Sequence, residues 1–550
     1  MENIKSITEA IEAVEGVALL DVDPGEATNR TVVTFAGEPE AVAEAAFQGI
    51  RKAAELIDMS KHHGAHPRMG ATDVCPFVPV SGVTLEECAD LARRLAQRVA
   101  DELGIPVYAY EAAALKPERK NLAVCRKGEY EGLAARMGTD DGADFGDRVF
   151  DGQMARTGAT AIGARDFLIA VNFNLNTTST RRANAIAFDV REKGRPLREG
   201  GKLTGKPLKD ADGKPLMQPG TLKGTKAIGW YIDEYGIAQV SMNITDTAAT
   251  PLHMAFDEVV RKADARGIRV TGTEIVGLVP RKALVEAGEY FLRKQQRSLG
   301  VPDKEKIRIA VKSMGLDELR PFVVEEKVVE DVLAARQPKQ AHLVDLSVSR
   351  FAETTASESP APGGGSVAAY MGALAAALGT MVANLAAHKA GWDDRWEEFS
   401  DMAEEGQSLM DSLLVLVDRD TEAFNSIMAA FGMPKTTEAE KGARVKAIHD
   451  ATVNAVEVPF RTLCETFATF ALLRRVAENG NPASASDAGV GALAARAAIH
   501  GAYLNMKINA ADISDGAVDV IMDEAAVLVA DADREEASIL AIVNEKISSK

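Results

Sequence analysis

A histidine-rich loop holds the densest group of titratable side chains in the sequence. Three of the eight histidines, His62, His63 and His66, fall within five positions, and Arg68 follows two residues later in SKHHGAHPRMGATDVCPFVPV (60–80). Glycine and proline interrupt this stretch so often that it is predicted to be loop. Imidazole exchanges protons near neutral pH, and loops can aim such groups into clefts. We therefore take this loop as the first candidate for catalytic chemistry.

A metal site is the main alternative for this loop. His62, His66 and Asp73 have the side chains that zinc prefers. The spacing of the two histidines would place them on one face of a helix, but Gly64 and Pro67 argue against a helix here. A zinc-dependent amidohydrolase is therefore an alternative, and metal-free proton transfer is the preferred hypothesis.

The second candidate is a carboxylate on an apolar helical stripe. In LLVLVDRDTEAF (413–424), Leu413, Val417 and Phe424 recur at helical spacing, and Asp420 falls on the same stripe. A carboxylate on a buried face is costly unless it is paired or used. Asp420 is thus either a catalytic acid or half of a buried salt bridge.

A glycine-rich turn and two amides are weaker candidates in the same half of the chain. The sequence PGGGS (362–366) precedes a long apolar run, so its backbone N–H groups and Ser366 as N-cap could bind an anion or a pterin. The glycines could equally form a tight turn for close helix packing. Asn505 and Asn509 lie at i and i+4, where they could contact a ligand or cross-link helices.

Composition narrows the class of protein. The chain has 550 residues and a net charge of −18, which disfavours nucleic acids and anionic membranes as partners. Its four cysteines form no close pairs, and its N-terminus has no signal-type apolar core, so a cytoplasmic location is expected. The apolar run 367–387 contains Asn384 and many small residues, which favours a buried bundle helix over a membrane span.

The elements around the histidine loop alternate between strand and helix. Apolar periodicity predicts helices at 5–14, 39–58 and 85–104, and strands at 16–23, 30–37 and 106–114. A second unit opens at 166, with strands at 166–175, 227–232, 237–244 and 267–280 and helices at 178–194 and 251–266. We predict two α/β sandwich subdomains, 1–165 and 166–333.

The rest of the chain is predicted to be helical. A polar linker (334–345) leads to six segments with helical apolar stripes and no strand-like alternation, at 346–355, 365–390, 396–430, 435–478, 483–509 and 516–545. The fold class is therefore multidomain, with the two α/β sandwich subdomains followed by an all-α helical bundle at 346–550.

The motifs also resemble a known family. The stretches LLDVDPGEATNRTVVTF (19–35), HGAHPRMGATDVCPFVPV (63–80) and GATAIGARDFLIAVNFNL (158–175) resemble glutamate formiminotransferases. SPAPGGGSVAAYMGALAAALGTMV (359–382) resembles formiminotetrahydrofolate cyclodeaminases. Their order is that of the bifunctional formimidoyltransferase-cyclodeaminase family.

The resemblance implies two reactions and their residues. A formimino group would pass from N-formiminoglutamate to tetrahydrofolate, with His66 as the catalytic histidine. Cyclisation to 5,10-methenyltetrahydrofolate with release of ammonia would use Asp420. Asp23 is nominated as the carboxylate partner of the histidine, and Arg68 either binds a substrate carboxylate or forms a salt bridge.

The resemblance further implies ligands and assembly. The folate-contacting segment would run between Gly146 and Gly158, and Gly364, Ser366 and Asn505 would contact folate in the second site. Tetrahydrofolate, expected to be polyglutamylated, would be the co-substrate, with no metal. A homo-oligomer in histidine degradation is expected. A transferase whose helical half serves only oligomerisation is the alternative.

Overall fold

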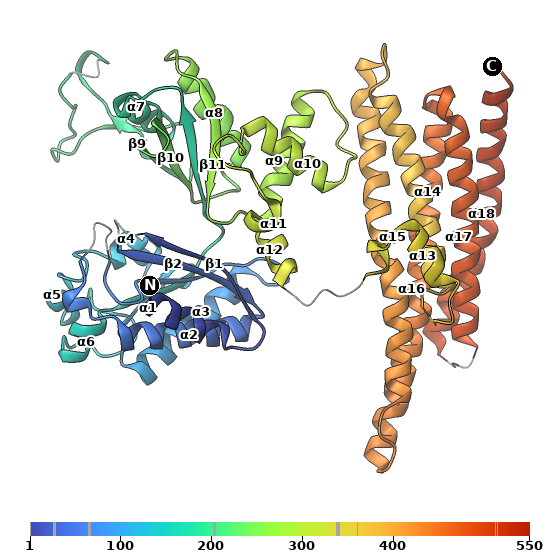
Figure 1. Ribbon diagram of the computed structural model, residues 1–550, viewed down its shortest axis with the longest axis horizontal. Helices are drawn as coiled ribbons and strands as arrows, with labels where there is room; N and C mark the ends of the chain where they lie inside the picture. The colour runs from blue at the N-terminus through green and yellow to red at the C-terminus, as the bar shows by residue number, and fades with distance from the viewer. Residues whose placement is uncertain are drawn as a thin grey trace. The chain divides into compact units, whose positions relative to one another are not determined.

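The computed structural model describes residues 2–25, 29–63, 68–201, 205–336, 342–359, 361–511, 513 and 515–549. The chain divides into two compact units (Figure 1). The first contains residues 1–287 and 310–339, and the second contains residues 288–309 and 340–550. The predicted succession of two α/β subdomains and a helical bundle is confirmed.

The first α/β subdomain has helices on both faces of its parallel strands: α2 and α3 pack on one face, and side chains of α4, α5 and α6 form a second buried cluster with Tyr108, Tyr110 and Ala161 on the other. Strands β1 and β2 form an antiparallel hairpin, and β3, β5 and β4 form a parallel sheet in that order. Buried side chains of α2, α3 and the strands, including Phe47, Leu95 and Ile162, make the core between these layers. The bounds are α1 (Glu2–Glu12), β1 (Val17–Gly25), β2 (Arg30–Gly37), α2 (Pro39–Leu56), β3 (Val74–Phe77), α3 (Leu85–Leu103), β4 (Val107–Glu111), α4 (Leu122–Cys125), α5 (Leu133–Met137), α6 (Gly152–Thr157) and β5 (Thr160–Ala164).

The second subdomain is built on an antiparallel sheet with the order β11-β6-β10-β9. Alternation along β6 buries Val171, Phe173 and Leu175 on one face and turns Asn172 and Asn174 to the other. Helices α7 and α8 pack on this sheet. The bounds are β6 (Ile169–Leu175), α7 (Thr180–Val190), β7 (Arg195–Pro196), β8 (Met217–Gln218), β9 (Thr225–Ile232), β10 (Ile237–Ile244), α8 (Leu252–Asp264), β11 (Val270–Val276), α11 (Val324–Lys327) and α12 (Val329–Arg336).

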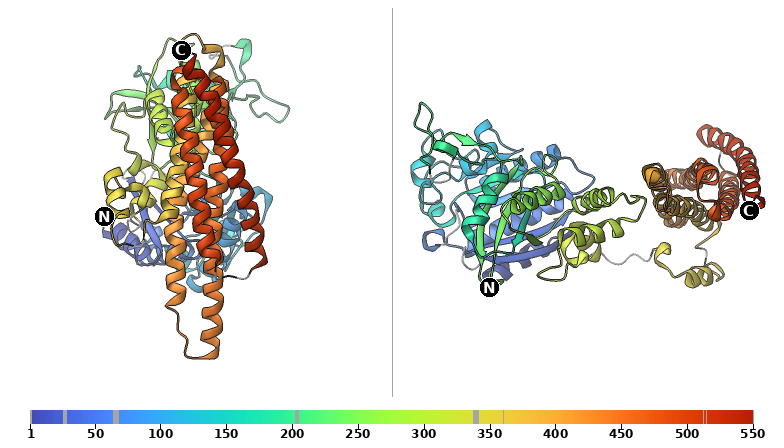
Figure 2. Two further views of the ribbon diagram at one scale, coloured as in Figure 1. Left: turned by 90° about the vertical axis from the view of Figure 1, so that its right-hand side faces the viewer. Right: turned by 90° about the horizontal axis from the view of Figure 1, so that it is seen from above.

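The second unit is a bundle of long helices (Figure 2). Helix α14 is long and apolar enough to cross a membrane, but 61% of its apolar window is buried in the bundle, where it packs against α15, α16 and α17. Helices α15 and α16 extend beyond the others as a projecting hairpin (Figure 2). The bounds are α13 (Val348–Thr355), α14 (Gly364–Ala387), α15 (Trp396–Phe431), α16 (Glu438–Asn479), α17 (Ala485–Ala510) and α18 (Gly516–Ser548).

The turn formed by residues 288–309 belongs to the bundle unit, although it lies within the predicted second α/β subdomain. Residues 288–309 contain the end of α9 (Arg281–Lys294) and the start of α10 (Asp303–Met314). The Ser298 backbone N–H donates to Nε2 of His388 at 3.2 Å, and the Leu299 N–H donates to Oγ of Ser400 at 3.0 Å. Asn384 Nδ2 donates to the Gly300 carbonyl at 2.8 Å. The sequence predicts 166–333 as one subdomain, whereas the compact units divide it at this turn.

Candidate active sites in the cleft and the bundle

A broad cleft of about 3310 Å³ opens in the first unit. Both α/β subdomains line it, and its walls carry the side chains that could do chemistry. They include Asp23, Arg30, His62, His63, Arg68, Asp73, Arg126, Glu129 and Glu131. The predicted histidine loop therefore borders the cleft.

Two backbone anchors hold the start of the histidine loop. His62 Nε2 lies 2.9 Å from the Asn29 carbonyl oxygen, and Asn29 Nδ2 donates to the His63 carbonyl at 2.7 Å. Asn29 has a left-handed backbone (φ 48°), which asparagine tolerates well. The predicted catalytic residue, His66, falls in 64–67, outside the described residues.

Gly158 supports the end of the same loop. The Ala159 N–H donates to the Met69 carbonyl at 2.9 Å, and Gly70 pairs with Gly158. A Cβ on Gly158 would lie 2.2 Å from the Met69 oxygen, and its φ is +68°. Gly146, also predicted to contact folate, has a φ of +87° and packs beside Ala100. Neither glycine is among the residues that line the cleft, so both have packing roles here, and their contact with folate stays a prediction.

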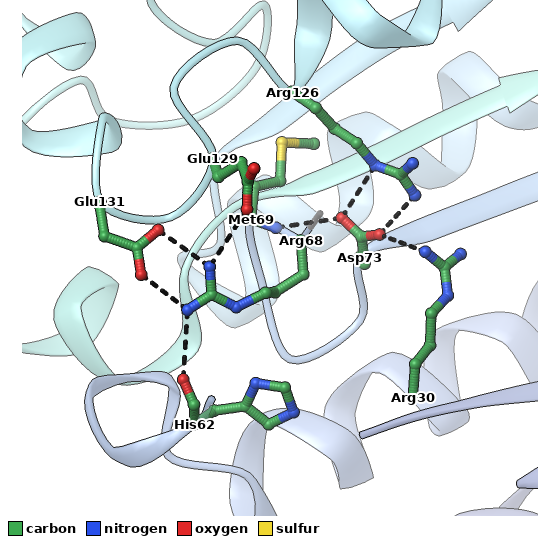
Figure 3. A network of polar contacts seen from close by, with 8 residues as sticks. All are labelled: Arg30, His62, Arg68, Met69, Asp73, Arg126, Glu129 and Glu131. Carbon is green, nitrogen blue, oxygen red and sulfur yellow. Dashed lines mark hydrogen bonds and ion pairs between the residues drawn. The ribbon is translucent and has the colours of Figure 1, made fainter. Parts of the chain in front are cut away.

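Arg68 is engaged by two carboxylates. Its guanidinium donates to both oxygens of Glu131, at 2.9 and 2.7 Å, and to Glu129 at 3.4 Å (Figure 3). It also donates to the His62 carbonyl at 3.2 Å. The Arg68 hydrogen bonds lower the pKa of Glu131 to about 2, and Glu131 in turn raises the pKa of Arg68. Of the two roles considered for Arg68, the structure therefore shows the salt bridge. A substrate carboxylate would have to displace Glu131 to bind Arg68.

Asp73 lies near Arg68 and its two carboxylate partners, but here a single carboxylate contacts two guanidinium groups. Arg30 Nη1 donates to Asp73 Oδ2 at 3.0 Å, and Arg126 contacts both Asp73 oxygens through Nη2 and Nε (Figure 3). The Met69 backbone N–H donates to Asp73 Oδ1 at 3.1 Å. From the sequence, Asp73 is a candidate metal ligand only, and both arginines are missed, because they belong to segments 43 and 53 residues away.

Asp23 is exposed at the edge of the cleft. It lies on β1, where its register partner is Val32 of β2. The pairing with His66 predicted for Asp23 involves a residue outside the described part of the chain, and it stays a hypothesis.

The second candidate site lies in the bundle, where α15 meets the N-terminus of α14. Ser366 Oγ donates to Asp420 Oδ2 at 3.1 Å and lies 3.3 Å from Thr421 Oγ1. A Cβ on Gly365 would lie 2.0 Å from Asp420 Oδ1, so only glycine admits the carboxylate there. Burial raises the pKa of Asp420, and hydrogen bonds from the Ser366 side chain and backbone oppose that rise. The site therefore holds a carboxyl group that takes up a proton more readily than ordinary aspartate.

The other predicted bundle residues gather at the same point. A Cβ on Gly364 would lie 3.3 Å from Nδ2 of Asn505, which donates to the Gly501 carbonyl of its own helix at 2.9 Å. Asn509 donates to the Ala455 carbonyl of α16 at 2.7 Å, as the helix cross-link alternative expects. Gly364, Ser366, Asp420 and Asn505 thus come together from three helices.

The metal alternative gains no support from the described ranges. Within residues 2–25, 29–63, 68–201 and the later described segments, no three His, Cys, Asp or Glu side chains form a group that could hold a metal ion. His66, a member of the proposed ligand set, lies outside these ranges.

Fold and sites together define a multidomain enzyme with an α/β cleft and a partly buried carboxylate in a helical bundle. Three family models match the chain: the formiminotransferase domain, N-terminal subdomain, at residues 1–165; the formiminotransferase domain at 170–334; and formiminotransferase-cyclodeaminase at 347–526. The chain belongs to the formimidoyltransferase-cyclodeaminase family.

Individual relatives cover one or both halves of the chain. Formimidoyltransferase-cyclodeaminase of Gallus gallus is 42% identical over 94% of this chain and 91% of its own length. The Sus scrofa protein of the same name is 41% identical over the same shares. Glutamate formimidoyltransferase of Streptococcus pyogenes serotype M1 is 40% identical over 53% of this chain and 88% of its own length. The resemblance predicted from the motifs is confirmed.

Proposed function

We propose that this protein catalyses two consecutive folate reactions at two separate sites. The formimino group of N-formimino-L-glutamate passes to N5 of tetrahydrofolate with release of glutamate. The 5-formimino product then closes to 5,10-methenyltetrahydrofolate with release of ammonia. The observation that carries this proposal is the partly buried Asp420 carboxylate of α15, which contacts the first turn of α14 and is remote in sequence from the histidine loop.

The first reaction needs a group that moves protons in both directions. N5 of tetrahydrofolate attacks the amidine carbon, giving a tetrahedral intermediate from which the nitrogen of glutamate departs. N5 loses one proton, and the departing nitrogen gains one. We assign both transfers to His66, because imidazole suits both tasks and such catalysis contributes about 10²- to 10⁴-fold.

The second reaction needs a proton donor for a departing nitrogen. N10 attacks the formimino carbon and loses its proton, and the former imino nitrogen leaves as ammonia after protonation. Asp420 suits this task because burial raises its pKa, and Ser366 fixes the orientation of its carboxyl group. We assign the transfer to the leaving nitrogen to Asp420.

The proposal also covers the co-substrate, the pathway, the location and the oligomeric state of the protein. Tetrahydrofolate is the co-substrate, and its polyglutamate tail fits the basic segment 191–226, which has ten Lys or Arg against four acids. The two reactions suit histidine degradation in the cytoplasm, with the second classed as a lyase step. Exposed apolar side chains on α14 and α17 support a homo-oligomer: Leu374, Met381, Leu385, Val490 and Leu493.

Activity of two variants tests both assignments. The assay follows absorbance of 5,10-methenyltetrahydrofolate and release of ammonia, starting either from formiminoglutamate or from preformed 5-formiminotetrahydrofolate. We expect His66→Ala to fail only from formiminoglutamate and Asp420→Asn to fail from both. If Asp420→Asn still cyclises the preformed compound at the normal rate, the bundle serves oligomerisation alone. Activity that disappears on chelation would favour the zinc hydrolase instead.

A further inference from the structure

Glu111 brings a carboxylate to the cleft at the carboxyl end of the parallel sheet. It is the last residue of β4, and its register partner on β5 is Ala164, which is also the partner of Phe77 at the end of β3. Glu111, Ala164 and the next residue, Arg165, all line the cleft. Ligands of open α/β sheets bind outside the carboxyl ends of the parallel strands. Glu111 therefore lies at the edge of the sheet where a ligand is expected.

The backbone of Glu111 has a conformation that glutamate rarely adopts. Its φ is +51°, in the left-handed region, where the Cβ of most residues is crowded. The Glu111 carbonyl accepts the Ala114 N–H at 3.1 Å, so the turn after β4 fixes this conformation. Residues other than glycine in such conformations concentrate at active sites and ligand-binding positions. Glycine would suit this turn better, which indicates that the Glu111 side chain has a role other than stabilising the fold.

The Glu111 carboxylate is an open acceptor in the wall of the cleft. Its residue is partly buried, and it has no hydrogen bond or ion pair with any residue that the structure describes. Burial raises its pKa, and the more distant charges of Lys226, Arg165 and Lys120 oppose that rise. A carboxylate that is withdrawn from water without a partner is costly. Two N–H donors from a ligand would replace the lost hydration.

The surrounding charges select the kind of donor. Lys226 and Arg165 also line the cleft, so a cationic group that approached Glu111 would be repelled by both. A neutral group with two parallel N–H donors avoids this cost and matches the two oxygens of a carboxylate. In tetrahydrofolate, the N3–H and the 2-amino group of the pterin ring form such a pair. The formimino group of the donor substrate also has paired N–H groups, but it is a cation at neutral pH.

The position of Glu111 along the sheet agrees with this choice. Asp73 holds the end of the histidine loop through the Met69 N–H, and its own carbonyl accepts the Ala161 N–H. Ala161 precedes Ala164 by three residues on β5, and about 3.3 Å per residue gives roughly 10 Å between the two levels. In a pterin, N5 belongs to the ring remote from the 2-amino group. A pterin bound at Glu111 can therefore direct N5 toward the histidine loop.

We propose that the Glu111 carboxylate accepts hydrogen bonds from the N3–H and the 2-amino group of the pterin ring of tetrahydrofolate, and so sets the orientation of the ring in the cleft. This assignment rests on the proposed function, in which tetrahydrofolate accepts the formimino group. Glu111 is then a specificity-determining residue of the first reaction, and cyclisation in the bundle does not use it.

The test follows release of glutamate at varied concentrations of either substrate. We expect Glu111→Gln to raise the KM for tetrahydrofolate by about 10-fold or more, because a hydrogen bond to a charged acceptor is lost. The KM for formiminoglutamate and cyclisation of preformed 5-formiminotetrahydrofolate should stay unchanged. An analogue of tetrahydrofolate without the 2-amino group should have a raised KM with the wild type and show little further rise with Glu111→Gln.

Gln296 provides a matched control for the backbone. Its φ is +53°, and it is exposed and is not among the residues that line the cleft. Glu111→Gly and Gln296→Gly each replace a side chain on a left-handed backbone by the residue that suits it. Both variants should melt close to or above the wild-type temperature, and only Glu111→Gly should raise the KM for tetrahydrofolate.

Four results would overturn the proposal. The first is an unchanged KM for tetrahydrofolate in Glu111→Gln. The second is a rise in the KM for formiminoglutamate, which would assign the carboxylate to the formimino group. The third is full additivity of the analogue and Glu111→Gln, which would show that the 2-amino group and Glu111 do not touch. The fourth is a melting temperature far below the wild type in Glu111→Gly but not in Gln296→Gly, which would make the Glu111 side chain structural.

Calorimetry with tetrahydrofolate alone separates this proposal from the proposed function. It requires no turnover, and Glu111→Gln should bind tetrahydrofolate more weakly than the wild type. A wild type that shows this difference from Glu111→Gln but releases no glutamate would overturn the proposed function and leave the pterin site in place.

Discussion

Asp420 couples stability to activity, because partial burial makes the charged form of its carboxylate costly. Its folded-state pKa is raised, so the stability from its protonated form is complete below the unfolded pKa and is lost as pH rises through the folded pKa. An asparagine side chain at this position would mimic the protonated form at every pH. We therefore expect Asp420→Asn to melt at or above the wild-type temperature at pH 7 while losing cyclisation, with the difference in melting temperature increasing with pH. Thermal unfolding across pH 4–8 measures this; a strongly destabilised variant would indicate a structural ion or cap role instead.

Ser366 affects the pKa of the Asp420 carboxyl group. Its hydroxyl and backbone N–H favour the charged form of Asp420, so removal of the hydroxyl should raise the Asp420 pKa further. If Asp420 donates the proton, cyclisation of preformed 5-formiminotetrahydrofolate declines as pH rises through its pKa. We expect Ser366→Ala to move that decline to higher pH, and Ser366→Thr to restore it. A pH profile that stays in place while the rate falls would limit Ser366 to packing.

Ser366 also shows how far a single sequence can predict a site. The glycine-rich turn predicts its position at the start of a helix and a side chain that meets a ligand. Its contact with Asp420 joins residues 54 positions apart, and no local pattern encodes that contact. Arg30 and Arg126 escape prediction for the same reason, because their contacts with Asp73 join residues 43 and 53 positions apart.

At the scale of elements, the junction between α14 and α15 depends on the absence of a side chain at Gly365. The N-cap of α14 is Gly363, not the predicted Ser366, which lies within the first turn. Glycine has no side chain to cap the helix, and the Asp420 carboxylate from α15 occupies this end instead. The close approach of Asp420 to Gly365 allows this contact. The same contact between Asp420 and the first turn of α14 thus caps the helix and positions the proposed catalytic acid.

Gly365→Ala should disrupt both functions of this junction. The added methyl would collide with Asp420, and overpacking of this kind costs about 1–3 kcal/mol. We expect loss of cyclisation, retained formation of 5-formiminotetrahydrofolate, and a lower melting temperature. Gly442→Ala in α16 is the matched control, since a Cβ there meets nothing within 4 Å and helix propensity alone predicts a gain of about 1 kcal/mol. Equal behaviour of the two variants would contradict this account.

The elements themselves follow closely from sequence periodicity. The predicted strands at 30–37 and 237–244 coincide with β2 and β10, and helix 85–104 is α3 with its end at Leu103. Alternation and 3.6-residue stripes are local signals, and tertiary packing here reinforces them. The division of the chain at 288–309 has no such signal, since Ser298 and Leu299 find their partners 90 and 101 residues later.

At the scale of the whole molecule, the chain leaves the first compact unit, enters the second, returns to the first and ends in the second. Residues 288–309 and 340–550 form one unit, and 310–339 return to the other. A cut in the linker 334–345 therefore separates the polypeptide but leaves the turn 288–309 within the bundle unit. We expect the fragments of a protein nicked at an engineered protease site near residue 340 to elute together in size-exclusion chromatography.

Weakening this turn should release the fragments. A Cβ on Gly300 would lie 2.3 Å from Ala403, so Gly300→Val should disturb the turn directly. Nicked Gly300→Val protein is expected to separate into two species, whereas intact Gly300→Val protein should elute as one. Separation of nicked wild-type protein under the same conditions would show that the turn contributes little binding energy.

The same turn imposes an order on biosynthesis. Ser298 and Leu299 leave the ribosome well before Ser400, and at about 5–20 residues per second the wait is roughly 5–20 s. During this interval the transferase half can fold, while Leu299, 2% exposed in the finished protein, still lacks the helices that cover it. Slow translation between residues 300 and 400 would prolong that exposure, so the nascent chain is most vulnerable to aggregation and most in need of a chaperone at that stage.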